Sequence, residues 1–291
     1  MSDAQQVGGI DRRWVYLLVA VGALLPVLIP MGLPILTTPA VEALFQRVES
    51  FGPQDVLMLS FDYGPSSAPE LDPMADAILR HCFTRGVRVV VLALFPLGGP
   101  NMAQGSLDRV TGEFSVEEGR DFVYLGYKDG AQAVMRRMAE DISAAFPRDH
   151  RGIPLKEIPL MQEVRGYPQI GVAVSLATGI LGEYWANLVN AQFGQTVAVG
   201  ATAVSAPKYY TYLKAGQMIG LLGGLKGAAE YEELLASAYP ELRDRARVAR
   251  RGMDVQSIVH LIIIVFILLG NVFYVLSRSE RTRAGGRLGP R

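Results

Sequence analysis

The sequence predicts an α/β fold flanked by two transmembrane helices, and three observations support this prediction. Two long apolar segments, residues 14–36 and 257–277, lie near the ends of the 291-residue chain. Between them, continuous apolar runs typical of buried strands alternate with segments of helical period. Turn residues, mainly Gly and Pro, separate these runs. We therefore expect residues 37–256 to form one large water-facing domain, or two closely joined ones.

The first apolar segment, residues 14–36, contains no charged side chain. About 20 apolar residues, rising about 1.5 Å each, cover the hydrocarbon core of a bilayer. Pro26, Pro30 and Pro34 recur at four-residue intervals, so we expect a kinked helix with a packing partner. A signal peptide is the competing interpretation, because two arginines precede the run. The run exceeds the usual apolar core of about 7 to 15 residues, which favours an anchor.

The second apolar segment, residues 257–277, lacks Asp, Glu, Lys and Arg and leads into a basic tail, residues 278–291. Two spans place both chain ends on one side of the membrane. Arginines in the two tails, residues 1–13 and 278–291, predict that the tails are cytoplasmic and that the central domain lies outside the cytoplasm. We expect the two spans to lie in the cell inner membrane. Five arginines between residues 243 and 251 oppose this assignment, so the membrane side of the domain stays open.

The first half of the central domain predicts a right-handed strand, helix, strand crossover, after a short helical connector. Residues 55–61 are a continuous apolar run bounded by turn residues, as in a strand buried on both faces. Ser67 and Glu70 have the spacing of a capping box, and Gly86 is placed to end the helix that they begin. Residues 87–95 predict the second buried strand.

The alternation of strands and helices continues along the chain. Further strands are expected at residues 121–127, 170–179 and 195–203, and helices at residues 129–146 and 180–193. Residues 210–239 are expected to be helical, although several glycines interrupt them. Such alternation indicates a Rossmann-like or flavodoxin-like fold, a mostly parallel sheet with helices on both faces.

Composition and motifs exclude several classes of function. Lys plus Arg equal Asp plus Glu at 28 each, so no basic surface for nucleic acid is expected. Cys82 is the one cysteine, and the three histidines lack metal-ligand spacing, so we expect no disulfide, no metal site and no serine–histidine triad. The GxGxxG and GxxxxGK[ST] patterns are absent, and the sequence therefore assigns no cofactor.

Polar side chains follow the predicted strands at their carboxyl ends, where open α/β sheets bind ligands. We expect these side chains to converge on one crevice that binds an anionic ligand: Asp62, Lys128, Asp129, Thr178, Ser205 and Lys208. The alternative for Asp62 and Asp129 is a turn or helix-cap role.

In residues 205–235, three tyrosines within residues 209–212 are followed by a series of glycines. Each glycine costs a helix about 0.8 to 1 kcal/mol relative to Ala, so close packing or association with another chain must compensate. The candidate interaction residues are Tyr209, Tyr210, Tyr212, Gly216, Gly220 and Gly224. The alternative is that the tyrosines form an aromatic belt against lipid headgroups or a ligand.

This segment, together with LSFDYGPSSAPELDPM (residues 59–74) and YLGYKDG (residues 124–130), resembles blocks shared by a family of uncharacterised bacterial membrane proteins. The resemblance covers most of the chain and implies two terminal transmembrane helices and a central α/β domain, but no activity. We therefore expect a membrane-anchored binding or assembly component of a membrane complex. Its partners would be the lipid bilayer and a second copy or other membrane proteins.

Two alternatives for the function stay open at this point. One is a membrane-bound hydrolase or transferase that acts on an anionic small molecule at the strand-end crevice and uses Asp62, Lys128 and Asp129. The other is a degenerate nucleotide-binding domain in the cytoplasm. The missing motifs favour the binding role over both.

Overall fold

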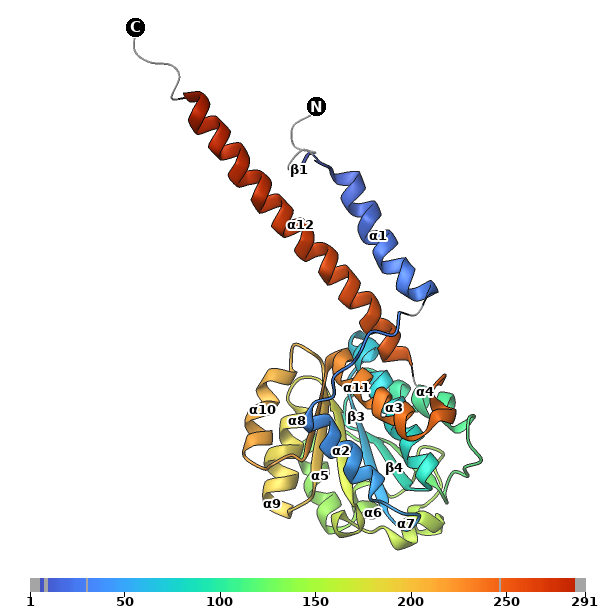
Figure 1. The fold of residues 1–291 in the computed structure, drawn as a ribbon. Helices are drawn as coiled ribbons and strands as arrows, with labels where there is room; N and C mark the ends of the chain where they lie inside the picture. The colour runs from blue at the N-terminus through green and yellow to red at the C-terminus, as the bar shows by residue number, and fades with distance from the viewer. Residues whose placement is uncertain (1–5, 8–9, 30, 246, 286–291) are drawn as a thin grey trace. The chain divides into compact units, whose positions relative to one another are not determined.

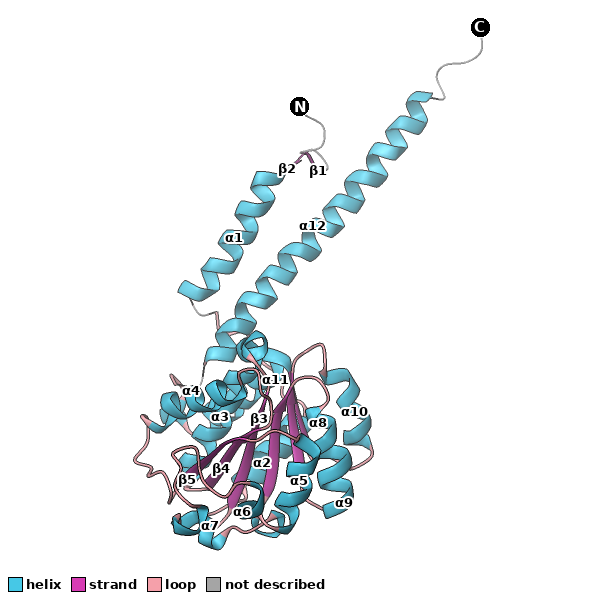
Figure 2. Cartoon of the chain, turned by 180° about the vertical axis from the view of Figure 1, so that it is seen from behind, coloured by secondary structure: helices cyan, strands magenta, loops and turns pink. Residues whose placement is uncertain are grey.

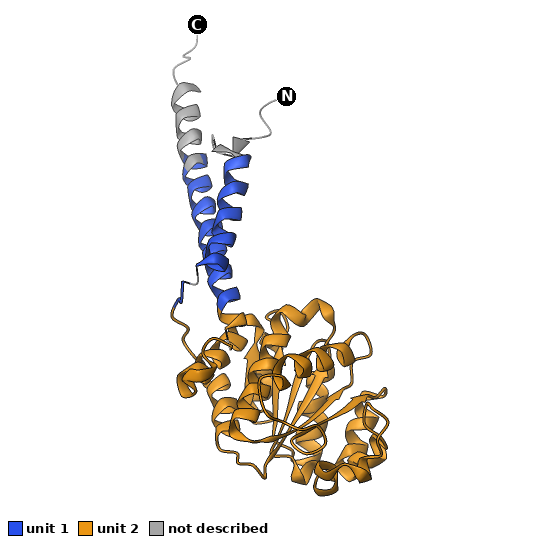
Figure 3. Cartoon of the chain, turned by 90° about the vertical axis from the view of Figure 1, so that its right-hand side faces the viewer, with its two compact units in different colours: residues 1–33, 251–291 blue, residues 34–250 orange. Residues whose placement is uncertain are grey.

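The computed structural model describes the whole chain except residues 1–5, 8–9, 30, 246 and 286–291. It contains two compact units, residues 1–33 with 251–291 (unit 1) and residues 34–250 (unit 2), coloured in Figure 3. Parts of both predicted tails, residues 1–13 and 278–291, thus lie outside the described residues. The side chains of residues 276–291 also lie outside them.

Unit 1 is built from two helices. β1 (Gln6–Val7) and β2 (Ile10–Asp11) form a short antiparallel pair and lead into α1 (Arg12–Leu28). The long helix α12 (Val248–Gly285) begins at the end of unit 2 and belongs to unit 1 from residue 251 onward. The predicted second span, residues 257–277, lies wholly inside α12.

The structure supports one of the two predicted spans by length and composition. Within α12, Val248–Val272 is long enough to cross a membrane and contains an 18-residue window with a mean hydropathy of 2.3; in the described part of the chain no other helix meets both conditions. The prediction that residues 14–36 form one spanning helix is wrong, because α1 ends at Leu28. Pro30 and Pro34 follow in the sequence, and neither can donate a backbone hydrogen bond to continue a helix.

The two helices of unit 1 are in contact. A Cβ at Gly22 of α1 would overlap the Ile262 side chain of α12 and lie 3.5 Å from Ile258. Beyond α1, the backbone N–H groups of Gly32 and Leu33 donate to the Asp254 carboxylate at 3.1 and 3.2 Å. Asp254 thereby satisfies two donors of the non-helical segment that follows α1.

A six-stranded sheet forms the centre of unit 2, and all of its strands are parallel (Figure 2). Its strand order is β5-β4-β3-β6-β7-β8, which in chain order is the 3-2-1-4-5-6 arrangement of the Rossmann fold. The strands are β3 (Val56–Asp62), β4 (Arg88–Ala93), β5 (Phe122–Tyr127), β6 (Val172–Ala177), β7 (Val197–Ala201) and β8 (Gly220–Gly223). The predicted α/β fold is confirmed, and its topological switch point lies between β3 and β6.

Helices cover both faces of this sheet (Figure 1). One face carries α2 (Pro39–Glu49), α3 (Ala68–Arg85), α4 (Gly99–Thr111) and α11 (Gly224–Ala238). The other carries α5 (Ala131–Glu140), α6 (Ile142–Ala145), the continuous helical segment α8 (Leu181–Tyr184), η5 (Trp185–Asn190, π-helical) and α9 (Ala191–Phe193), and α10 (Ala206–Lys214). Short turns complete the unit: η2 (Pro65–Ser67), η3 (Leu155–Glu157), α7 (Pro159–Glu163), η4 (Tyr167–Gln169) and η6 (Pro240–Leu242).

Several predicted element boundaries are wrong, and each has a local cause. The predicted helix at residues 129–146 breaks at Asp141, whose carboxylate accepts the Ser143 N–H at 2.8 Å and begins α6. The predicted helix at residues 210–239 is instead α10, strand β8 and α11. The capping box is also absent: Ser67 makes no side-chain cap, and Glu70 accepts a hydrogen bond from the Ala203 N–H at 2.8 Å.

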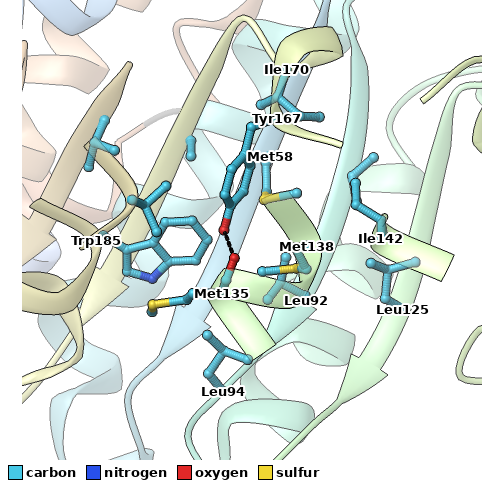
Figure 4. Packing of buried hydrophobic residues seen from close by; sticks show 14 of the residues in the cluster. Met58, Leu92, Leu94, Leu125, Met135, Met138, Ile142, Tyr167, Ile170 and Trp185 are labelled. Atoms are coloured by element: carbon cyan, nitrogen blue, oxygen red, sulfur yellow. Dashed lines mark hydrogen bonds between the residues drawn. The ribbon is translucent and has the colours of Figure 1, made fainter. Parts of the chain in front are cut away.

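A hydrophobic core lies between the sheet and the layer that contains α5 and α6 (Figure 4). All seven residues of β3 are buried. Figure 4 shows the side chains that fill this space, among them Met58, Leu92, Leu94, Leu125, Met135, Met138, Ile142, Ile170 and Trp185. The Tyr167 side chain lies within the core, and its hydroxyl donates to the Met135 carbonyl oxygen at 2.8 Å. This core fixes the strand ends at which a ligand site was predicted.

Candidate functional site

Asp62 ends β3 at the switch point and is fully buried. Its carboxylate accepts four hydrogen bonds: from the Ser60 hydroxyl (2.8 Å), the Ser175 hydroxyl (2.6 Å), the Trp185 indole N–H (2.9 Å) and the Leu94 N–H (3.3 Å). Burial raises the pKa of Asp62, and the hydrogen bonds oppose that effect. Asp62 therefore joins β3, β6, η5 and the segment after β4, and it lies inside the core instead of lining an open crevice.

Tyr209 of α10 lies close to this carboxylate and is also fully buried. Its hydroxyl has no hydrogen-bond partner among the described residues. A Cβ at Gly182 would lie 2.5 Å from that hydroxyl oxygen, so only a glycine lets the ring fit beneath the start of α8. Burial, with the nearby charges of Glu183 and Asp62, raises the pKa of Tyr209.

The loop after β4 lies directly on the loop after β3. A Cβ at Gly64 would lie 2.6 Å from the Leu97 carbonyl oxygen, and one at Gly99 would lie 2.8 Å from the Phe61 carbonyl oxygen. Gly98 has φ of 106°, which favours glycine. These glycines thus let the backbones of the two loops approach closely. The loop after β4 therefore covers the end of β3.

Thr178 and Ser205, two of the predicted ligand residues, are half-buried in loops after β6 and β7. The Thr178 N–H donates to the Asp62 carbonyl oxygen at 3.1 Å. The Ser205 hydroxyl oxygen accepts from the Thr202 hydroxyl at 3.2 Å. Both therefore make contacts that shape the strand ends.

Lys208, a third predicted ligand residue, belongs to an ion pair between α10 and α8. Its ammonium lies 2.7 Å from a Glu183 carboxylate oxygen and donates to the Gly179 carbonyl oxygen at 2.5 Å. The Tyr212 hydroxyl donates to the other Glu183 oxygen at 3.2 Å. Lys208 thus already has two acceptors within the chain.

Lys128 and Asp129 follow β5, which is an edge strand of the sheet. Three strands separate β5 from β7, and at about 4.8 Å between neighbouring strands this spans about 19 Å. The six predicted ligand residues therefore form two groups, one around Asp62 and one at the β5 edge, and not one crevice.

The predicted interaction residues divide between the interior and the surface. Tyr209 is buried, a Cβ at Gly220 would lie 2.8 Å from the Leu44 Cβ of α2, and Gly224 packs against Ala203. These three support packing inside the unit. The other three are accessible: Tyr210 and Gly216 are exposed, and Tyr212 is half-buried.

The surface hollows in the described part of unit 2 include the following three. One of about 360 Å³ is lined by residues that include Asp141, Lys156 and Arg165. Another of about 690 Å³ lies at the amino ends of β4 and β5, beside Arg88 and Asp121. The third, of about 460 Å³, lies at the carboxyl end of β5 and includes Lys128, Arg148 and His150. Of the predicted ligand residues, only Lys128 lines one of the three.

A chain of buried hydrogen bonds that the sequence did not reveal joins α2, α3 and α11. His81 Nδ1 lies 2.8 Å from the Tyr231 hydroxyl oxygen, and Nε2 lies 2.8 Å from a Glu49 carboxylate oxygen. The Tyr239 hydroxyl donates to the same carboxylate at 2.9 Å. A neutral ring that accepts from Tyr231 and donates to Glu49 satisfies every group.

The pKa values of this chain follow from burial and hydrogen bonding. Burial lowers the pKa of His81, although Glu49 opposes that effect. Burial also acts to raise the pKa of Glu49, but the hydrogen bonds from His81 and Tyr239 outweigh it and lower that pKa. No sequence signal predicts the chain, because its members are 32 and 150 residues apart.

In the described part of the chain, no group of three or more His, Cys, Asp and Glu side chains is arranged to hold a metal ion. Comparisons of the chain with protein-family models, with curated proteins and with solved structures found no match.

Proposed function

We propose that this chain is a membrane-anchored protein whose α/β domain binds other chains and acts as an assembly component of a membrane complex. The exposed apolar surface of α12 carries the proposal. Its large apolar side chains are 41% to 61% exposed at positions 261, 263, 264, 265, 267, 268, 269 and 272. Exposing so long an apolar surface to water is unfavourable in free energy, and the hydrocarbon core of a bilayer would cover this surface.

Carboxylates of α11 hold the chain segments near both ends of unit 2. Glu232 accepts the N–H groups of Ala249 (3.1 Å) and Arg250 (2.9 Å) at the start of α12. Glu230 accepts the N–H (2.8 Å) and the hydroxyl (2.6 Å) of Thr38 before α2. One helix of unit 2 thus holds chain segments near both ends of that unit.

We include α1 in the anchor as a second membrane segment. Its 17 residues give about 26 Å of helix, a few ångströms short of a core of about 30 Å, and local thinning of the bilayer accommodates such a mismatch. The Gly22 contact and the Asp254 hydrogen bonds support a helix pair with a satisfied backbone. In this proposal the tails are cytoplasmic and the domain lies outside the cytoplasm.

The environment of Asp62 at the switch point favours a binding protein over an enzyme that uses this carboxylate in catalysis. Four donors already occupy its carboxylate, and Lys208 is paired with Glu183. A hydrolase or transferase that used Asp62 would have to break this buried network in each cycle.

Native mass spectrometry on gently solubilised membranes tests the proposal. We expect the full chain in the alkali-resistant membrane fraction, in a defined homo-oligomer or with a stoichiometric protein partner. Ile264→Arg combined with Leu268→Arg should release the chain from that fraction, since each central arginine costs about 2.5 to 3.5 kcal/mol on insertion. Val204→Arg, at an exposed position after β7, is the control. A lone monomer in both detergent and nanodiscs would refute the assembly role.

A further inference from the structure

The hollow of about 460 Å³ at the carboxyl end of β5 has walls that the fold holds in place. One wall is the end of β5 and the other is the loop at residues 146–150. The His150 N–H donates to the Tyr124 carbonyl oxygen at 3.1 Å. Gly126 has φ of 85°, and a Cβ there would lie 3.5 Å from the His150 Cβ, so the loop lies close against the strand. The volume is within the usual range of ligand sites, about 300 to 1,000 Å³.

The hollow presents two cations that lack a carboxylate partner. Among the described residues, no hydrogen-bond acceptor or acid contacts the Lys128 ammonium. The Arg148 guanidinium donates to the Gly152 carbonyl oxygen at 2.7 Å and makes no ion pair within the described chain. Its other N–H groups remain available to a ligand.

Three acids lie near the hollow: Asp129 accepts a hydrogen bond from the Tyr127 hydroxyl at 3.3 Å, and the other two, Asp149 and Glu118, are paired with cationic side chains. Asp149 is buried, forms an ion pair with Arg151 at 2.8 Å, and accepts the N–H groups of Arg151 and Ile153. Glu118 is shared between His150 (2.9 Å) and Arg151 (3.2 Å). The lining thus has a net positive charge.

We propose that this hollow binds a phosphate group, with Lys128 and Arg148 as its two cationic contacts. Arg presents several N–H donors to phosphate oxygens, and Lys adds a point charge. Leu125, Tyr127 and Phe146 line the same hollow and provide an apolar surface for the body that carries the phosphate. Two sources have this chemistry: a soluble phosphate compound and the headgroup of an anionic phospholipid. The site goes beyond the proposed assembly role and does not depend on it.

Binding to the full chain in neutral detergent tests this site at constant ionic strength. One arm titrates inorganic phosphate by calorimetry, and the other titrates mixed micelles of phosphatidylglycerol against phosphatidylcholine. We expect saturable binding in at least one arm, weakened at least tenfold by Lys128→Ala and by Arg148→Ala. The matched controls, Lys156→Ala and Arg165→Ala, remove one lysine and one arginine from a different hollow and should leave binding unchanged.

Each outcome decides the proposal. Binding of inorganic phosphate assigns a soluble ligand, whereas binding of phosphatidylglycerol alone assigns a lipid headgroup. No saturable binding in either arm refutes the site, as does an equal loss in the control variants, which would indicate general charge attraction. All variants alter exposed or half-buried side chains, and circular dichroism checks that they fold. Membrane fractionation and oligomeric state are separate measurements, so failure here leaves the assembly proposal standing.

Discussion

The two ends of the parallel sheet use buried polar groups in different ways. At the carboxyl end, Asp62 ties strands together, is closed to solvent, and has a raised pKa. Toward the amino end, where α3 returns to the start of β4, His81 and Glu49 tie helices together. Glu49 is about one third exposed, and both of these groups have lowered pKa values. The buried Asp62 network therefore makes the carboxyl end of the sheet rigid. At the amino end, His81 and Glu49 can change protonation state as the pH falls.

Removing the Asp62 carboxylate should give the largest effect. Asp62→Ala leaves the donors of Ser60, Ser175, Trp185 and Leu94 buried without an acceptor, which costs about 3 to 5 kcal/mol in total. Thermal unfolding of the full chain in detergent measures the loss. Asp129→Ala, at an exposed position, should stay within about 0.5 kcal/mol. Equal stability of the two variants would show that Asp62 is not a hub of the fold.

The Asp62 network also shows why the sequence could not reveal this site. Its donors lie 2, 32, 113 and 123 residues from Asp62, so only the folded sheet brings them together. The strands β3 to β7 were predictable, because strands buried on both faces are continuous apolar runs. β8 was not, since its four residues begin and end with glycine, and α4 was missed because it opens with Gly99 and Pro100.

Acid should destabilise the amino end through His81. The folded-state pKa of His81 lies below its unfolded value of 6.5, so its contribution is complete above that pH and is lost as pH falls through the folded pKa. Glu49, with an unfolded value of 4.5, acts in the same direction at lower pH. His81→Phe keeps a ring to stack on Phe45, whose centroid is 4.4 Å away, but removes the titration.

Unfolding temperatures between about pH 7 and about pH 5 check this prediction. The unsubstituted protein should lose stability over that interval, and His81→Phe should be less stable at neutral pH by about 1 to 3 kcal/mol but show a flatter profile. His150→Phe, on an exposed loop, is the matched control. Parallel profiles for the His81 variant and the unsubstituted protein would place the titrating group elsewhere.

Substitutions of two glycines test how closely α2 packs against β8 at the amino end of the sheet. Gly220→Ala adds a Cβ at 2.8 Å from the Leu44 Cβ and 2.9 Å from the Ala40 carbonyl oxygen, so β8 or α2 must move, at about 1 to 3 kcal/mol. Gly216→Ala meets no atom within 4 Å, but its φ of 71° should cost about 1 to 2 kcal/mol. Chemical unfolding of both variants separates the two causes. If Gly220→Ala is neutral, α2 does not pack against β8 as described.

The smallest effect should come from Lys208, on the surface of the carboxyl end. Its ion pair with Glu183 is partly exposed, and such pairs contribute about 0 to 1 kcal/mol, so Lys208→Ala should barely change stability. A double-mutant cycle with Glu183→Gln measures the coupling, which added salt should reduce. A coupling well above 1 kcal/mol would mean that the rigid network around Asp62 extends to the surface. A coupling within the expected range would confine that rigidity to the buried strand ends.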